Sequence, residues 1–182
     1  MKHLLEEDDE ILITEIEHHA NFVPWQEVAK EKKATVIFAP IEDNGEIDLK
    51  KFNRDYDKIF HLAAIIGVKH VNRSPYKVLI DNINLLDNLI KVAQCQKKLS
   101  KFVFFSTSEV YSGTLKYYGL KIPTPETTPL TVNDLNIGRT SYMLSKIYGE
   151  MMCNLSNELP HINLRPHNFY GPRMGFSHVI PE

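Results

Sequence analysis

The sequence is poor in glycine, and its first glycine is Gly45. A sheet that binds a nucleotide usually opens with a strand, a glycine-rich turn and a helix, because phosphate groups must approach bare backbone amides at the start of that helix. Here the first predicted strand leads into Glu17-His-His-Ala-Asn-Phe22, whose side chains fill that space and whose Glu17 carboxylate repels phosphate. The opening of the chain is therefore predicted not to bind phosphate in this way.

Cysteines, long apolar runs and net charge are also scarce. The two cysteines, Cys95 and Cys153, lack a second ligand at zinc or redox spacing, so we expect ordinary thiols and no metal site. No apolar run approaches the roughly 20 residues of a membrane-spanning helix, and the acidic residues 1–10 do not resemble a secretory signal. A formal net charge of -2 provides no attraction for nucleic acid or an anionic membrane. We expect a cytoplasmic protein with neither of these partners.

What the sequence does contain is an alternation of strands and helices. The predicted order is strand 11–16, helix 22–33, strand 35–39, strand 59–62, helix 77–98, strand 102–105, a helix with a buried stripe over 143–152, and strand 162–164. Parallel strands joined by helices predict an α/β fold with a doubly wound parallel sheet. The proline-containing stretch 112–139 is predicted to be a long irregular loop, either functional or disordered.

A tyrosine and a lysine lie one helical turn apart in the sequence Tyr142-Met-Leu-Ser-Lys146. A free tyrosine has a pKa near 10, so a role as a base near neutral pH requires a much lower pKa. A neighbouring ammonium favours the phenolate and would supply part of that change. A second pair, Tyr117 and Lys121, encloses Gly119, so we expect it to lie in a loop. The first pair is the candidate for proton transfer at a sugar-type hydroxyl.

Polar side chains follow the predicted strand 102–105. Thr107 and Ser108 stand where open α/β sheets place their ligands, at the carboxyl end of a parallel strand, so their hydroxyls could hold a substrate oxygen. The alternative is that they only shape the turn. Glu109 beside them is a candidate second base, or a solvated carboxylate at the end of the strand.

These motifs resemble the extended short-chain dehydrogenase/reductase proteins, specifically the NAD-dependent epimerase/dehydratase group that modifies nucleotide sugars. The resemblance covers residues 56–182 and implies a Rossmann-like fold. The matching pieces are Ile59-Phe-His-Leu-Ala-Ala64, Asn82, Phe104-Phe-Ser-Thr-Ser-Glu-Val-Tyr111, Ser141-Tyr-Met-Leu-Ser-Lys146 with Gly149-Glu150, and Leu164-Arg-Pro-His-Asn-Phe-Tyr-Gly-Pro-Arg173.

The resemblance implies a role for each matching residue. Tyr142 would be the catalytic base and Lys146 its helper, which also holds the nicotinamide ribose of NAD; NAD and NADP are not distinguished. Thr107 would take the catalytic hydroxyl position. The triplet Thr107-Ser108-Glu109 is similar to that of nucleotide-sugar decarboxylases and some dehydratases, whereas many dehydratases carry Asp in place of Ser108. The residues implied for binding are His61, Leu62, Ala63 and Ala64 for the cofactor, and Ser108 and Asn168 for the nucleotide-sugar substrate.

The opening segment, residues 7–52, resembles a piece of a different family, the pyridoxal-phosphate cysteine desulfurases. The matching pieces are Asp9-Glu-Ile-Leu-Ile13, Glu17-His-His-Ala-Asn21, Val23-Pro-Trp-Gln26 and Asp43-Asn-Gly-Glu-Ile-Asp-Leu49. In that family the position of His18 stacks on the cofactor ring, but the Schiff-base lysine and the attacking cysteine are not represented here. We therefore interpret His18 and His19 as a turn or cap pair, and Trp25 as a core residue.

The two resemblances together predict a chain made of two parts. Residues 1–52 are predicted to form a desulfurase-like βαβ segment and residues 53–182 a partial epimerase/dehydratase domain, joined by fusion, a rearranged frame or engineering. A missing glycine-rich loop and a chain end before the substrate lobe predict a sheet truncated at both ends. The predicted function is that of a nucleotide-sugar epimerase, dehydratase or decarboxylase, impaired or inactive as this chain. The alternative is a non-catalytic remnant or fusion product that at most binds a partner or a nucleotide sugar. Separately, exposed apolar helix faces could pair with a second copy as a homodimer, or aggregate.

Overall fold

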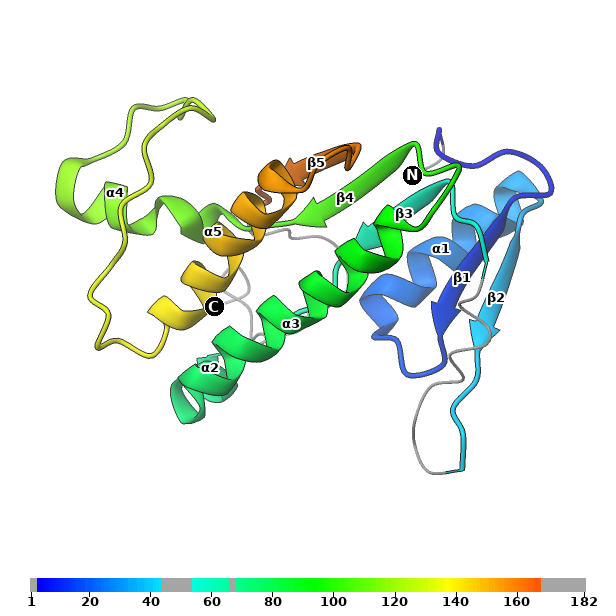
Figure 1. The fold of residues 1–182 in the computed structure, drawn as a ribbon, viewed down its shortest axis with the longest axis horizontal. Coiled ribbons are helices and arrows are strands. Elements are labelled where there is room, and N and C mark those ends of the chain that lie inside the picture. Colours follow the sequence, from blue (N-terminus) through cyan, green and yellow to red (C-terminus); the bar gives the residue numbers. More distant parts are fainter. Residues whose placement is uncertain (1–2, 44–53, 66–67, 168–182) are drawn as a thin grey trace. The chain divides into compact units, whose positions relative to one another are not determined.

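The computed structural model describes residues 3–43, 54–65 and 68–167, and its chain divides into two compact units, Met1–Asp55 and Tyr56–Glu182 (Figure 1). Each unit is described by itself. No helix in the described ranges is both long and apolar enough to cross a membrane.

The first unit is a single βαβ motif. Strand β1 (Glu10–Thr14) pairs in parallel with β2 (Thr35–Ala39), and α1 (His19–Lys32) connects them. The helix ends where Lys33 takes a left-handed conformation with φ 58°, which turns the chain into β2. Trp25 of α1 is buried, as predicted, and the ring of Phe22 packs edge-on against Phe38 at 5.5 Å.

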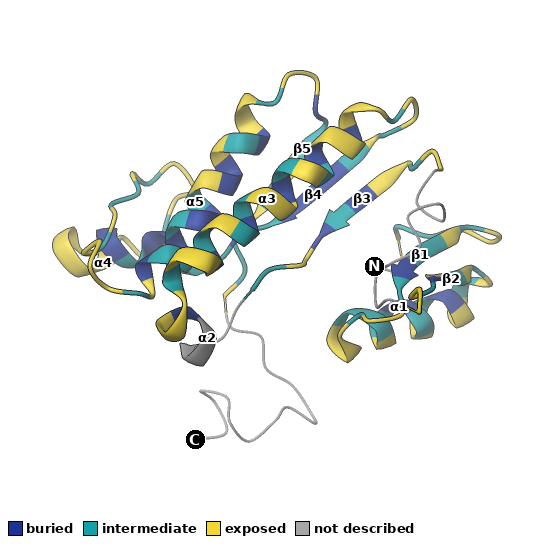
Figure 2. Ribbon diagram, turned by 60° about the horizontal axis from the view of Figure 1, so that its bottom comes forward, coloured by how far each residue is buried: buried dark blue, intermediate teal, exposed yellow. Residues whose placement is uncertain are grey.

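The second unit is a three-stranded parallel sheet with two long helices packed against each other. The strand order is β3 (Lys58–His61), β4 (Lys101–Phe105) and β5 (His161–Leu164). Helices α3 (Pro75–Gln94) and α5 (Thr140–Leu155) lie side by side, with their buried residues turned toward the sheet (Figure 2). The shorter elements are α2 (Val68–Arg73), the 3-10 helix η2 (Ser108–Tyr111) and α4 (Ser112–Tyr118).

The core of this unit lies between the sheet and the two long helices. Alternation along β4 turns Phe102 and Phe104 to this side, where they are almost completely buried. At Gly149 the backbone of α5 approaches β4 so closely that an added Cβ would lie 2.4 Å from Cζ of Phe104. The remaining core residues are Ile59, Leu86, Ile90, Ala93, Cys153 and Leu159.

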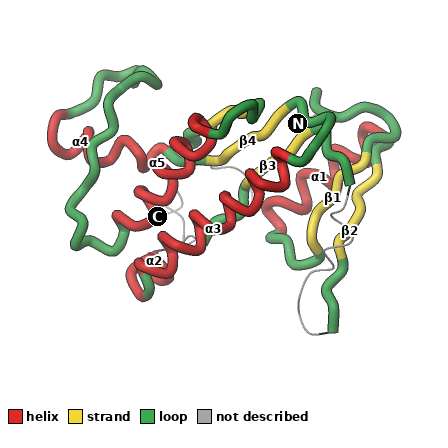
Figure 3. Tube along the Cα trace, viewed as in Figure 1, coloured by secondary structure: helices red, strands yellow, loops and turns green. Residues whose placement is uncertain are grey.

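The predicted α/β class with parallel strands is confirmed, and each predicted strand is displaced by no more than two residues at either end. Among the described residues the strands form two hydrogen-bonded sheets, β1-β2 and β3-β4-β5. One prediction was wrong in part, because the stretch 112–139 begins with helix α4 before it becomes loop (Figure 3). Helix α2 was also not predicted.

Candidate active site

The carboxyl end of β4 leads directly into a polar turn. Thr107 caps η2, because its Oγ1 accepts a hydrogen bond of 3.3 Å from the backbone amide of Glu109. The backbone amide of Ser108 donates to the carbonyl of Pro166, 2.9 Å away, just beyond β5. The turn is thereby fixed at the edge where two parallel strands end, which is the usual ligand side of such sheets.

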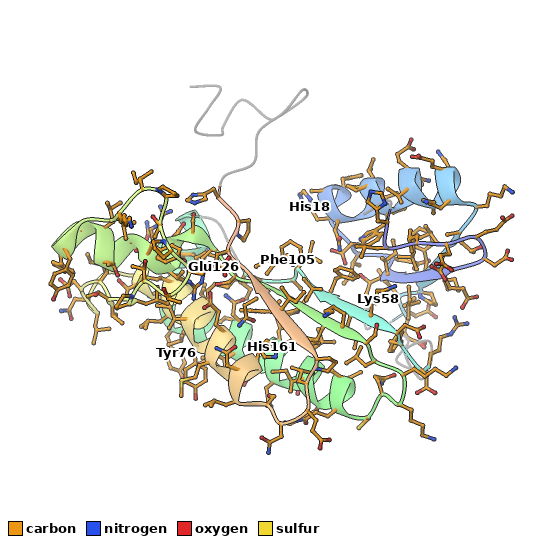
Figure 4. All side chains as sticks on the ribbon, turned by 90° about the horizontal axis from the view of Figure 1, so that it is seen from above. His18, Lys58, Tyr76, Phe105, Glu126 and His161 are labelled. Atoms are coloured by element: carbon orange, nitrogen blue, oxygen red, sulfur yellow. The ribbon has the colours of Figure 1, made fainter. Side chains whose placement is uncertain are left out.

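Helix α5 brings Tyr142 and Lys146 to this turn. The phenol of Tyr142 makes a side-chain hydrogen bond with Thr107. Lys146 is 4% exposed, and its Nζ lies 5.8 Å from the centroid of the Tyr142 ring. That ammonium donates a 2.7 Å hydrogen bond to the carbonyl of Phe105, which Figure 4 labels on β4. The three groups proposed from the sequence to act together therefore lie together.

The electrostatics of Tyr142 differ from the expectation. Burial raises the pKa of Tyr142 above its usual value, and the carboxylate of Glu109 raises this pKa further. The hydrogen bond with Thr107 and the charge of Arg139 lower the same pKa, but they do not cancel the first two effects. The expected lowering by Lys146 was wrong for this state of the site, because the ammonium is directed to a backbone carbonyl. Tyr142 is thus a protonated phenol near neutral pH.

Burial also changes the basic groups beside the tyrosine. It lowers the pKa of Lys146 to about 8, because a buried ammonium loses its hydration. His61 of β3 stacks on Phe104 with 5.8 Å between ring centroids. Burial and the nearby charge of Lys146 lower the pKa of His61 to about 4, so this imidazole is neutral at physiological pH.

The carboxylate of Glu109 is held by an arginine that sequence analysis did not single out. The guanidinium of Arg139 donates to it through Nε at 3.2 Å and through Nη2 at 2.6 Å. Glu109 is therefore a paired carboxylate that is 30% exposed, and its role as a second base stays a prediction. Arg139 stands three residues before Tyr142, at the start of α5, so the spacing itself is the signal that could have pointed to it.

The other predicted site residues lie in different settings. The side chain of His61 is buried against Phe104, whereas Leu62 and Ala63 are exposed and Ala64 is partly buried in the segment after β3. That Leu62, Ala63 and Ala64 line a cofactor groove therefore stays a prediction. Because the His61 side chain is buried, it is less suited to contact a cofactor. Ser108 is partly buried within η2. Asn168 lies outside the described residues.

A hydrogen-bond network that was not predicted connects the turn after β4 to the neighbouring elements. Glu150 of α5 accepts two hydrogen bonds from the guanidinium of Arg165, at 2.9 and 2.5 Å, and a third from Oγ of Ser106. Arg165 also donates to the phenol oxygen of Tyr111 at 2.6 Å and to the carbonyl of Glu126 at 3.0 Å. These contacts join β4, β5, α5, η2 and the long loop. Glu150 and Arg165 belong to quoted motifs, but their pairing across the fold cannot be read from spacing.

A second unpredicted contact fixes the segment after β3. The buried side chain of Asn82 accepts a 2.7 Å hydrogen bond from the backbone amide of Ile65 and donates to the hydroxyl of Ser145 at 3.3 Å. Ser145 lies directly before Lys146 in α5. One amide therefore connects α3, α5 and the segment that begins with Leu62.

In the first unit, side chains accept hydrogen bonds from the backbone amides at the start of α1. Nδ1 of His18 accepts a 3.1 Å hydrogen bond from the backbone amide of Ala20, so the predicted cap role of His18 is confirmed (Figure 4). The carboxylate of Glu17 accepts from the backbone amide of His18 at 3.2 Å. Two amides that a phosphate would need are thus already bound, and these residues do not fit a pyrophosphate at this helix end.

The fold and the site together define a Rossmann-like α/β protein with a tyrosine–lysine pair at the carboxyl ends of parallel strands. The model of the NAD dependent epimerase/dehydratase family matches residues 1–182, and the chain belongs to this family.

Individual relatives match in two different ways. A probable cysteine desulfurase from Staphylococcus aureus is 49% identical over 67 residues, which is 35% of this chain and 16% of that protein. The solved structure of DdhaC is similar with a TM-score of 0.73 and 23% identity, over 97% of this chain and 53% of its own. A UDP-glucuronic acid 4-epimerase variant from Bacillus cereus, solved with NAD and a UDP-sugar analogue, has a TM-score of 0.63 and 24% identity, over 93% of this chain and 60% of its own. The chain thus spans little more than half of these structures, and at such identities they show the fold.

Proposed function

We propose that this protein carries out proton transfer on a nucleotide sugar, in an NAD-dependent epimerase, dehydratase or decarboxylase type of reaction. The observation that carries the proposal is the meeting of Thr107, Tyr142 and Lys146 at the carboxyl end of β4. The nucleotide-sugar enzymes among the similar structures support the substrate class.

The geometry suggests how these residues would act. A sugar oxygen placed against the hydroxyls of Thr107 and Tyr142 would exchange its proton with the phenol. The raised pKa keeps the phenol of Tyr142 protonated, so in the described state it can donate a hydrogen bond to a carbonyl oxygen, as a weaker acid than a free tyrosine. Removal of a proton from a hydroxyl would need additional positive charge beside the phenol. NAD in this family accepts or returns the hydride that accompanies such a proton transfer.

The residues fit this cofactor only in part. The ammonium of Lys146 and the exposed segment from Leu62 to Ala64 are suitable for the ribose and the nicotinamide end. In the first unit, taken by itself, the start of α1 is not suited to bind a phosphate, because Glu17 and His18 already accept hydrogen bonds from its amides. The opening segment also has no glycine before Gly45 and so no glycine-rich turn, and we therefore expect NAD affinity to be weak and this chain to be impaired or inactive.

A second candidate function is supported by the same mismatch. A chain that binds a nucleotide sugar or a protein partner without turning it over would keep the β4 turn and would not need a phosphate site at α1. The proposal also includes a boundary between a desulfurase-like segment, residues 1–52, and an epimerase-like segment, residues 53–182. A fusion origin of the chain is a further part of it.

A homodimer and a cytoplasmic location are further parts of the proposal. Helices α3 and α5 carry large apolar side chains on the side away from the core, where a second copy could cover them. These exposed residues are Ile80, Leu85, Val92, Tyr148, Met151 and Leu155.

Ligand-induced thermal stabilisation tests the proposal. A ligand at 100 times its dissociation constant stabilises a protein by about 2.7 kcal/mol. We expect a UDP-sugar to raise the melting temperature and NAD to do so only at millimolar concentration. Tyr142→Phe should abolish any sugar oxidation and leave the ligand-free melting temperature unchanged. Stabilisation by the UDP-sugar without any turnover supports the second candidate. No response to either ligand contradicts the first proposal and leaves only binding of a protein partner from the second.

A further inference from the structure

The pair formed by Glu109 and Arg139 lies beside the proposed proton donor without being part of its hydrogen bond. Glu109 follows Thr107 by two residues, and Arg139 precedes Tyr142 by three, so each partner is attached to one side of the Thr107–Tyr142 contact. The two guanidinium nitrogens at 3.2 and 2.6 Å grip the carboxylate in a forked arrangement. The side chains of Arg139 and Glu109 are 57% and 30% exposed, which places the pair at the surface of the site.

We propose that Arg139 is a positioning residue, whose guanidinium holds the Glu109 carboxylate in place and so limits how strongly that carboxylate opposes loss of the Tyr142 proton. The inference rests on the proposed function for its importance, but the effect on the phenol does not require catalysis.

The charges around the phenol make this control plausible. Among the described residues, α5 contributes Arg139 and Lys146, the β4 turn contributes Glu109, and β3 contributes the neutral His61 next to Lys146. The ammonium of Lys146 donates its hydrogen bond to the carbonyl of Phe105. The negative charge of Glu109 is instead balanced by the guanidinium of Arg139, which donates to its carboxylate. Coulomb energy falls with distance, so a carboxylate that moved toward the phenol would oppose its ionisation more strongly.

A forked grip is a property of arginine that lysine does not share. Arginine presents its donors in a plane that matches both carboxylate oxygens, whereas lysine is a point charge on a flexible stem. Arg139→Lys keeps the positive charge and removes the fork. This substitution therefore separates positioning of Glu109 from a direct effect of charge on Tyr142.

The test is a titration of the Tyr142 phenol in the full chain. Replacing the 8 tyrosines by 3-fluorotyrosine makes the phenols more acidic and gives each a fluorine NMR signal, which moves the titration to milder pH. The Tyr142 signal is assigned by its loss in Tyr142→Phe. The titration is repeated for Arg139→Lys, Glu109→Gln and the double variant.

The expected result is a dependence on Glu109. Arg139→Lys should raise the pKa of Tyr142 when Glu109 is present and should leave it unchanged in the Glu109→Gln background. Glu109→Gln alone should lower that pKa. An unchanged pKa in Arg139→Lys, or an equal shift in both backgrounds, would overturn the inference.

The variants should remain folded, because exposed ion pairs contribute little to stability. Equal melting temperatures of the four proteins check this. The titration uses neither NAD nor a sugar, so the proposed function can fail through absent ligand binding while the dependence on Glu109 is still observed.

Discussion

The hydrogen bond between Tyr142 and Thr107 shows both what residue spacing predicts and what it misses. The four-residue step from Tyr142 to Lys146 correctly placed both side chains on one face of a helix, next to the end of β4. The direction of the pKa change was not predictable from that spacing. It depends on burial and on the carboxylate of Glu109, which reach the phenol only through the tertiary fold.

Thr107→Val should raise the pKa of Tyr142 further. The hydrogen bond from Thr107 is one of the two influences that lower this pKa, and valine keeps the shape of the side chain without the hydroxyl. Absorbance of the phenolate during an alkaline titration measures the change. Ser108→Ala is the matched control, because it removes a neighbouring hydroxyl from the same turn. A Thr107→Val protein with the wild-type titration curve would argue against this hydrogen bond.

Lys146→Met should change how stability depends on pH. The folded-state pKa of Lys146 is about 8 and its ordinary value is 10.5, so the unfolded chain binds more protons between these values. The folded protein therefore gains stability from this residue as pH rises from about 8 to 10.5, by about 3 kcal/mol. Urea unfolding of wild type and Lys146→Met at pH 7 and pH 10 gives the difference. A constant difference between the two proteins would mean that Lys146 titrates normally.

Strands and long helices were predictable because their patterns are repeated along the chain, whereas short elements were not. The short apolar run of β4 gave that strand within one residue of its observed ends, and the apolar stripe over 143–152 gave α5 within three residues of its ends. Helix α4 was missed because only seven residues form it, between the β4 turn and the proline-containing loop. Its place is decided by tertiary contacts, such as the 2.7 Å hydrogen bond from Thr114 to the carbonyl of Pro129.

Gly149→Ala should destabilise the second unit. An alanine Cβ would lie 2.4 Å from Cζ of Phe104, and overpacking of this kind costs typically 1–3 kcal/mol. Gly138→Ala is a suitable control, because its Cβ would be no closer than 3.4 Å to its nearest neighbour. Denaturant unfolding of both variants compares the two positions. Equal losses of stability at the two glycines would show that α5 can move away from β4.

Arg165→Met should be far more disruptive than the loss of a surface ion pair. Glu150 is buried and Arg165 is partly buried, so Arg165→Met leaves a buried carboxylate without its guanidinium partner, at a cost of up to about 3–5 kcal/mol. Lys91→Met removes one partner of an exposed pair with Asp87, where about 1 kcal/mol or less is expected. Thermal melts of the two variants, followed by circular dichroism, measure the contrast. Similar melting temperatures would mean that the network around Glu150 contributes little.

The family could be recognised from motifs in residues 56–182, while the family model matches the first unit as well. The two findings are compatible, because a βαβ unit such as β1-α1-β2 can follow the order of the family's opening elements without its glycines. Sequence comparison records the order of elements. Whether phosphate can bind depends on individual amides, and here those of His18 and Ala20 are already bound.

Opening the start of α1 should therefore increase the affinity of the first unit for the phosphate groups of NAD. The double substitution Glu17→Gly and His18→Gly removes a repelling carboxylate and frees two backbone amides, at a cost in capping of only a few tenths of a kcal/mol. Thermal-shift titrations with NAD should reach their midpoint at a lower concentration in the double variant than in wild type. His19→Gly is the matched control, because it adds a glycine next to this position and leaves both the His18 cap and Glu17 in place. If the midpoint is the same in all three proteins, occupancy of this helix end is not what limits binding of the cofactor, and the weak affinity must have another cause.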